Sequence, residues 1–354
     1  MSKFTKTTKI ERLRGRLFYQ YRRQDYASAA RLGEALLKAH TNLYNGKNTA
    51  YADDLYNTAL ANASAGHIDR AIELYTESIH RHFEMRGADL IVAARMSNLG
   101  ALLSNYGQHE AACRIFVQAL TIRKRMLHCK HVELADSLYN MGNALIKAAR
   151  QREAIPALTS AMHIYTRVDS DNLIPCLQTL AAAHQALEEY DKAIPYAEAA
   201  WRSLALSDID EHYRAAYALA FLYEEAGLAD DACQLYLSIM EWIGQKVGYK
   251  HSSYVYIATK AASMLAKLNE YEQAKSILQR LKKLVEEMVG RGNLTYSNCT
   301  RNLAVVHRHL EEWDEAERLL LESIAIKESI IGGQAVEDSM LLEDIYSSRE
   351  PFGK

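Results

Sequence analysis

Apolar positions along this chain recur with the spacing of an α-helix, in segments separated by short polar turns. In one segment Leu138, Met141, Gly142 and Leu145 follow steps of three, one and three residues, which places them on one helix face. A second amphipathic stretch covers residues 154–165, after a turn. Gly (16) and Pro (4) are scarce among the 354 residues, which argues against a turn-rich all-β fold. The pattern predicts an all-α protein built of helix pairs.

The helix pairs repeat at a nearly constant period. Each turn is followed by an alanine, and these closing alanines are Ala29, Ala71, Ala112, Ala154, Ala193, Ala232, Ala274 and Ala316. Their successive separations are 42, 41, 42, 39, 39, 42 and 42 residues. Twelve residues earlier, seven of the eight units carry a small residue: Ala59, Gly100, Gly142, Ala181, Ala220, Ala262 and Ala304. The first unit has Leu17 there and is the most divergent. We therefore expect an array of about eight hairpins in which small residues allow close helix contacts.

The small residue, the turn, the aromatic that often follows it and the closing alanine together resemble a tetratricopeptide repeat. The long period, and the equivalent places of His131 and His251, resemble the kinesin-light-chain-like subclass of that family. The heptad coiled coil of a kinesin light chain is absent, so no motor subunit is implied. The resemblance implies an all-α, right-handed superhelical solenoid of about eight hairpins with a C-terminal capping helix.

The two ends differ in charge from the body. Residues 1–23 carry eight Lys/Arg and one Glu, whereas residues 334–354 carry two basic and five acidic residues. We expect a basic tail at 1–9, the repeat array at 10–333, and a capping helix with a C-terminal tail at 334–354. In the first helix Ile10, Leu13 and Leu17 form an apolar stripe, and the surrounding arginines are either a solvated helix face or a patch for an anionic partner.

No motif for catalysis or for a cofactor is found in the sequence. P-loop, GxGxxG, GxSxG and HExxH motifs are absent, and the two His-x-His pairs do not share a helix face. Carboxylate pairs such as Glu224 and Glu225 are interpreted as a solvated face. The five cysteines form no CxxC pair, and the basic N-terminus lacks the apolar core of a signal peptide, so we expect reduced thiols and a cytoplasmic location. The sequence predicts no enzyme, no metal and no cofactor.

In the family that the chain resembles, the first helix of each hairpin lines a long concave groove that binds peptides. Carried over unit by unit, the groove positions are Tyr56, Asn57, Asn98, Tyr139, Asn140, Asn143, Lys147, Tyr217, Lys260, Lys267, Arg301, Asn302 and Arg308. Asparagine both donates and accepts hydrogen bonds, so it can hold the backbone of an extended peptide with little regard to its sequence. Lysine and arginine in the last units favour a ligand that is acidic at one end.

The leading hypothesis is therefore a non-catalytic scaffold or adaptor that binds an extended peptide or a partner segment. No small-molecule substrate is expected. Two alternatives stay open. One is an intracellular receptor for a short signalling peptide. The other is a factor that binds nucleic acid or a membrane surface through residues 1–23.

Overall fold

The computed structural model describes residues 3–44, 49–128, 131–204, 208–332 and 335–349. Within these ranges the chain forms seventeen α-helices and no strand. The helices follow one another as eight pairs and a final helix, so the predicted all-α repeat architecture is confirmed. The chain divides into two compact units, Met1–Leu187 and Glu188–Lys354.

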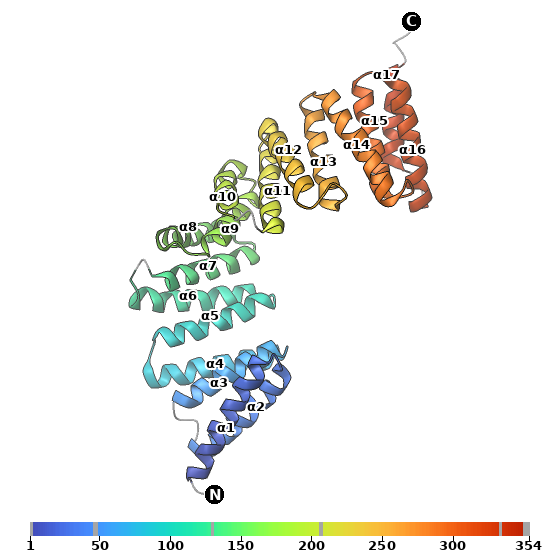
Figure 1. Ribbon diagram of the computed structural model, residues 1–354. Helices are drawn as coiled ribbons and strands as arrows, with labels where there is room; N and C mark the ends of the chain where they lie inside the picture. Colours follow the sequence, from blue (N-terminus) through green and yellow to red (C-terminus); the bar gives the residue numbers. More distant parts are fainter. Residues whose placement is uncertain (1–2, 45–48, 129–130, 205–207, 333–334, 350–354) are drawn as a thin grey trace. The chain divides into compact units, whose positions relative to one another are not determined.

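The first unit contains nine helices within the described ranges, and successive helices lie side by side in chain order (Figure 1). They are α1 (Lys3–Arg22), α2 (Tyr26–Tyr44), α3 (Thr49–Ser64), α4 (Ile68–Arg86), α5 (Leu90–Asn105), α6 (His109–Met126), α7 (Val132–Lys147), α8 (Gln151–Val168) and α9 (Leu173–Gln185).

The second unit contains the remaining eight described helices. They are α10 (Tyr190–Ser203), α11 (Ile209–Glu225), α12 (Ala229–Lys246), α13 (Ser252–Lys267), α14 (Tyr271–Val289), α15 (Leu294–His309), α16 (Trp313–Ile331) and α17 (Val336–Arg349). Helix α17 packs on α16 and matches the expected capping helix. We call the odd-numbered helices α1 to α15 the A helices, and the even-numbered ones the B helices.

Small side chains form the contact between the two helices of each pair that lies within one unit. All eight closing alanines have 0% exposure. The small residues twelve positions earlier are buried as well. A Cβ atom built on Gly142 would lie 2.6 Å from Leu158 Cγ, which is far inside van der Waals contact. The sequence period therefore marks the sites where helix backbones approach most closely.

Every hairpin turn has a residue with left-handed backbone conformation at the same position. Five positions before each closing alanine φ is positive, between 58° and 83°, at Gln24, Gly66, Gly107, Ala149, Glu188, Gly227, Asn269 and Glu311. At seven of these turns the next residue donates its N–H to a carbonyl five residues back, as from His67 to Asn62 at 2.9 Å and from Arg150 to Leu145 at 2.8 Å. This is the Schellman arrangement, which satisfies carbonyl groups at a helix end.

Two histidines that occupy equivalent sequence positions also play the same structural role. His131 and His251 are the N-caps of α7 and α13, and each ring accepts a hydrogen bond from a backbone N–H two residues later at 3.2 Å. The cap satisfies one of the donors that a helix start leaves unpaired.

The first helix begins earlier than the sequence suggested. Helix α1 starts at Lys3, inside the segment 1–9 that was expected to be a tail. Its stripe is confirmed as a packing face, because Ile10 and Leu17 are 4% and 1% exposed and pack with Leu36. Arg14 reaches across to Asp54 with two hydrogen bonds of 2.7 and 2.9 Å. The first pair is thus held to α3 by an ion pair in addition to apolar contacts.

We predict that Gly142→Leu lowers the free energy of unfolding by about 1–3 kcal/mol, because the new side chain must displace the fully buried Leu158. Thermal or urea unfolding measures the change. Gly15→Ala is the matched control: nothing lies within 4 Å of its added Cβ, so this helical position should gain roughly 0.5–1 kcal/mol. Equal effects of the two substitutions would contradict a close contact at Gly142.

Two turn substitutions should change stability in opposite directions. Gly107→Ala places a Cβ on a residue with φ +78° and should cost about 1 kcal/mol, whereas Ala149→Gly, at φ 59°, removes that strain and should stabilise the protein by a similar amount. Urea unfolding of each variant and of the parent compares glycine with alanine at the same turn position. A loss of stability in both variants would show that the left-handed conformation does not control these turns.

Candidate functional site

In the first unit, three asparagines occupy the same position on successive A helices. Asn57, Asn98 and Asn140 lie on α3, α5 and α7, at separations that match the repeat period, and all three are partly exposed. We call them, together with Asn143 on α7, the amide row. The row forms because each hairpin has almost the same length, so equivalent residues reach the same helix face.

One member of the amide row is held in place by its neighbours. Asn98 donates from Nδ2 to the hydroxyl oxygen of Tyr56 at 2.6 Å. The Tyr56 ring packs edge-on against Tyr75 at 5.7 Å, and the Arg95 guanidinium lies 5.4 Å from its centroid. Burial raises the pKa of Tyr56, so the phenol stays protonated. Asn98 Oδ1 remains available to accept a hydrogen bond.

The other amides have open hydrogen-bonding groups. Within the described ranges, the side chains of Asn57, Asn140 and Asn143 make no hydrogen bond to the protein. Tyr139 packs edge-on against Tyr165 at 6.4 Å, and Tyr165 donates to Asp136 at 2.7 Å. Lys147 is exposed at the end of α7. This face of the first unit therefore offers neutral donors and acceptors to a ligand.

In the second unit, the corresponding face is aromatic and charged. The hydroxyl groups of Tyr217 on α11 and Tyr256 on α13 lie 2.8 Å apart, and their rings lie 5.5 Å apart. Glu224 forms ion pairs with Lys260 at 3.5 Å and Lys267 at 2.6 Å, and its side chain is only 14% exposed. Glu224 is thus not the solvated residue that the sequence suggested.

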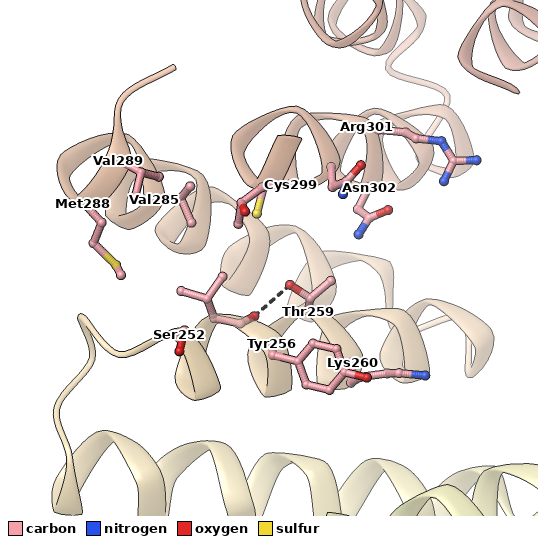
Figure 2. Close-up of a pocket in the computed structure, with 13 residues that line it drawn as sticks. Ser252, Tyr256, Thr259, Lys260, Val285, Met288, Val289, Cys299, Arg301 and Asn302 are labelled. Atoms are coloured by element: carbon pink, nitrogen blue, oxygen red, sulfur yellow. Dashed lines mark hydrogen bonds between the residues drawn. The ribbon is translucent and has the colours of Figure 1, made fainter. Parts of the chain in front are cut away.

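A pocket of ≈530 Å³ lies beside these residues, bounded by α13, the end of α14 and α15. Figure 2 shows Val285, Met288 and Val289 of α14 on one side, with Tyr256 and Lys260 of α13 below. Its apolar walls include Val255, Val285 and Cys299, which are at most 7% exposed. Polar groups on the lining are Ser252, Tyr256, Thr259, Lys260, Thr295, Asn298, Arg301 and Asn302. An apolar cavity with a few polar groups at its rim is the usual form of a ligand site.

The tetratricopeptide repeat family matches residues 92–167 and 254–329. These segments cover α5–α8 in the first unit and α13–α16 in the second, and they include the amide row's Asn98, Asn140 and Asn143 and most of the pocket. Two segments of this chain therefore match tetratricopeptide repeats. No catalytic family matches it, and no curated protein sequence matches it.

Solved structures with a similar fold include other proteins with helical repeats. A signal-transduction ATPase with a tetratricopeptide repeat sensor from Pyrococcus horikoshii is 14% identical at a TM-score of 0.54, over 94% of this chain and 49% of that one. The present chain therefore spans about half the length of that protein. The apo form of RapI is 13% identical at a TM-score of 0.50, over 86% of this chain and 99% of that one. TPR-like repeats of a kinesin light chain from Podosopora anserina are 17% identical at a TM-score of 0.47, over 55% and 95%. At these identities the likeness concerns the fold alone.

The arginines expected to meet an acidic ligand already have acidic partners. In the last tetratricopeptide repeat, Arg301 Nε lies 2.9 Å from Asp338 Oδ1, and Arg308 pairs with Asp344. Asp338 is buried and also accepts hydrogen bonds from Ser323 at 2.6 Å and Lys327 at 2.8 Å. Both arginines therefore hold α17 on the repeat. Asn302, beside them on α15, makes no hydrogen bond among the described residues.

Of the residues that line the pocket, the sequence predicted Lys260, Arg301 and Asn302, and Tyr256 and Asn298 are among those that it missed. Tyr256 is 49% exposed and lies one helical turn before Lys260, and Asn298 lies one turn before Asn302. The spacing of four residues from a predicted position was the signal that could have found both.

The four described cysteine thiols are buried. Cys113, Cys176, Cys233 and Cys299 are free and buried, while Cys129 lies outside the described residues. Burial raises the pKa of Cys176 to about 12 and that of Cys299 to about 11, so neither forms a thiolate near neutral pH. In the part of the chain that the structure describes, no cluster of His, Cys, Asp and Glu could hold a metal, and no helix could cross a membrane.

The Glu224 ion pairs make the second unit sensitive to acid. Burial by itself would raise the pKa of Glu224, but Lys267 and Lys260 outweigh it and hold the pKa below its ordinary value of 4.5. A carboxylate with a lowered pKa stabilises the fold above its unfolded-state pKa, and this contribution is lost as pH falls through the lowered value.

We predict that Glu224→Gln lowers the free energy of unfolding by about 1–2 kcal/mol at neutral pH and by little in strong acid, measured by urea unfolding across pH. Glu225→Gln, which changes the exposed neighbouring carboxylate, is the control. A loss of stability in Glu224→Gln that persists unchanged in acid would show that the ion pairs are not its cause.

Proposed function

We propose that this protein is a non-catalytic scaffold whose repeats bind a segment of a partner protein in an extended conformation. The amide row carries the proposal. Side-chain amides with open hydrogen-bonding groups recur at one register on α3, α5 and α7, and such amides can pair with backbone groups of an extended chain. Tetratricopeptide repeats are typically protein-binding modules, which supports the same function.

The pocket of the second unit supports a complementary contact. Its apolar walls fit a hydrophobic side chain of a ligand, while Asn298 and Asn302 at the rim are placed to hold the adjoining backbone. The acidic end expected for the ligand is not part of the proposal. Lys260 and Lys267 are paired with Glu224, and Arg301 and Arg308 with carboxylates of α17, so none of the four is an unpaired cation.

We also propose that these repeats belong to the kinesin-light-chain-like subclass and that the protein is cytoplasmic. The period near 42 residues and the equivalent caps His131 and His251 support the first point. Buried cysteines without a disulfide among the described residues support the second.

Peptides selected from a random library on the intact protein test the proposal. Asn98→Ala combined with Asn140→Ala should raise Kd roughly 30-fold, because two hydrogen bonds of about 1 kcal/mol each are lost. The loss should be similar at low and high salt, since both groups are neutral. Fluorescence anisotropy measures the affinity. Gln118→Ala with Gln151→Ala removes two amides from the B helices α6 and α8 and should leave Kd unchanged.

A second arm tests the pocket. Thr295→Trp fills the pocket from its exposed rim, whereas Gln273→Trp adds the same side chain to an exposed position on α14. Only the first should weaken peptides that carry a hydrophobic anchor. If neither the asparagine pair nor Thr295→Trp changes any selected affinity, the peptide site lies elsewhere on the chain. The double substitution Arg301→Glu with Arg308→Glu is unsuitable as a test of the site, because it places carboxylates opposite Asp338 and Asp344 and should detach α17.

A further inference from the structure

The outward side of α1 carries a row of cations. Lys9, Arg12 and Arg16 follow steps of three and four residues on one face of α1, Arg23 comes directly after the last residue of the helix, and all four are exposed. Tyr19, which is 59% exposed, lies on the same face between Arg16 and Arg23. We call these four basic residues the cationic row. At 1.5 Å per residue it extends over ~21 Å.

The carboxylates near α1 pair with other groups. Asp54 pairs with Arg14 and Asp53 with Arg95, while Asp25 accepts the backbone N–H of Ser28 at the start of α2. Among the described residues, no carboxylate lies within 4.0 Å of a basic nitrogen of the cationic row. Glu11 is on α1 itself and is exposed, and it lies off the face of the row. Lys9, Arg12 and Arg16 are therefore cations without a carboxylate partner among the described residues, in contrast to Arg14 on the same helix, whereas Arg23 interacts electrostatically with Asp25.

The orientation of α1 is fixed by its other face. Ile10 and Leu17 are buried against Leu36, so the apolar stripe cannot serve as a membrane-inserting face. Packing instead holds the cationic row outward, with Tyr19 (59% exposed) beside it. The Arg23 guanidinium covers the Tyr19 ring at 5.7 Å and donates to its hydroxyl at 3.3 Å.

We propose that this face of α1 binds the anionic headgroups of a lipid membrane surface. A straight helix that presents a single row of cations is convex and can engage many headgroups of a plane at once, through charge and without insertion. The exposed ring of Tyr19 suits the headgroup layer, where an amphipathic side chain is favoured. Single-stranded nucleic acid fits less well, since it stacks its bases on open aromatic faces, and Arg23 covers one face of Tyr19.

Vesicle co-sedimentation of the full chain tests the proposal. We expect binding to phosphatidylcholine vesicles that contain about 30% phosphatidylserine at about 0.1 M NaCl, and none at about 0.5 M NaCl or on pure phosphatidylcholine. Arg12→Glu, Arg16→Glu and Arg23→Glu together should lower the bound fraction at least ~10-fold. Arg114→Glu, Arg152→Glu and Arg167→Glu make the same charge change at exposed, unpaired arginines of α6 and α8, and should bind more strongly than the first triple variant.

Several results would overturn the lipid assignment. They are no binding of the parent to the anionic vesicles, equal losses in the two triple variants, and salt-independent binding to pure phosphatidylcholine. Displacement of the vesicles by single-stranded RNA or duplex DNA at lower concentration than the lipid would assign the face to nucleic acid instead. Arg12→Gln with Arg16→Gln, checked by circular dichroism melting, removes charge without reversal and keeps the test valid if the first triple variant does not fold. Peptide binding by the parent and by the Asn98/Asn140 variant is measured separately, so the two proposals fail independently.

Discussion

Close contact between the two helices of a hairpin is the constraint on which the other features depend. Eight closing alanines are completely buried, and a Cβ on Gly100 or Gly142 would lie 2.9 Å from Phe116 or 2.6 Å from Leu158. Because this contact recurs every 39 to 42 residues, equivalent side chains on neighbouring A helices come within hydrogen-bonding distance. The bond between Tyr56 and Asn98 and that between Tyr217 and Tyr256 both join residues about one period apart. Packing thus decides which polar groups become neighbours.

The turns show that packing also outweighs local backbone preference. Five of the eight left-handed turn residues are not glycine, and Ala149, Glu188 and Glu311 adopt a conformation that costs an L-residue roughly 1 kcal/mol. Burial of the helix pair on either side supplies more stabilisation than this. The sequence located the turns through the closing alanines, but Ala149 and Glu188 gave no local sign of a left-handed residue.

Features that repeat were predictable from the sequence, and features that occur once were not. The helix pairs, the buried alanines, the stripe of α1 and the equivalence of His131 and His251 all follow from spacing. The pairing of Arg301 with Asp338 does not, because α17 is not a repeat unit and its docking depends on tertiary geometry. The partly buried Glu224 was likewise misinterpreted, since two lysines from another helix, Lys260 and Lys267, surround it.

The charged side chains of α15, of α1 and of the amide row's surroundings differ in whether they are paired. The three regions are therefore suited to different kinds of contact with a partner. On α15 the arginines pair with carboxylates of α17, on α1 Lys9, Arg12 and Arg16 have no carboxylate partner among the described residues, and the amide row is neutral. If the amide row binds a partner as proposed, its specificity therefore has to come from geometry. Arg95 pairs with Asp53 and lies against Tyr56, and Tyr56 in turn accepts from Asn98, so a chain of contacts orients the Asn98 carbonyl before any ligand arrives. A group that is already oriented loses less conformational freedom on binding, and more of its hydrogen-bond energy then contributes to affinity.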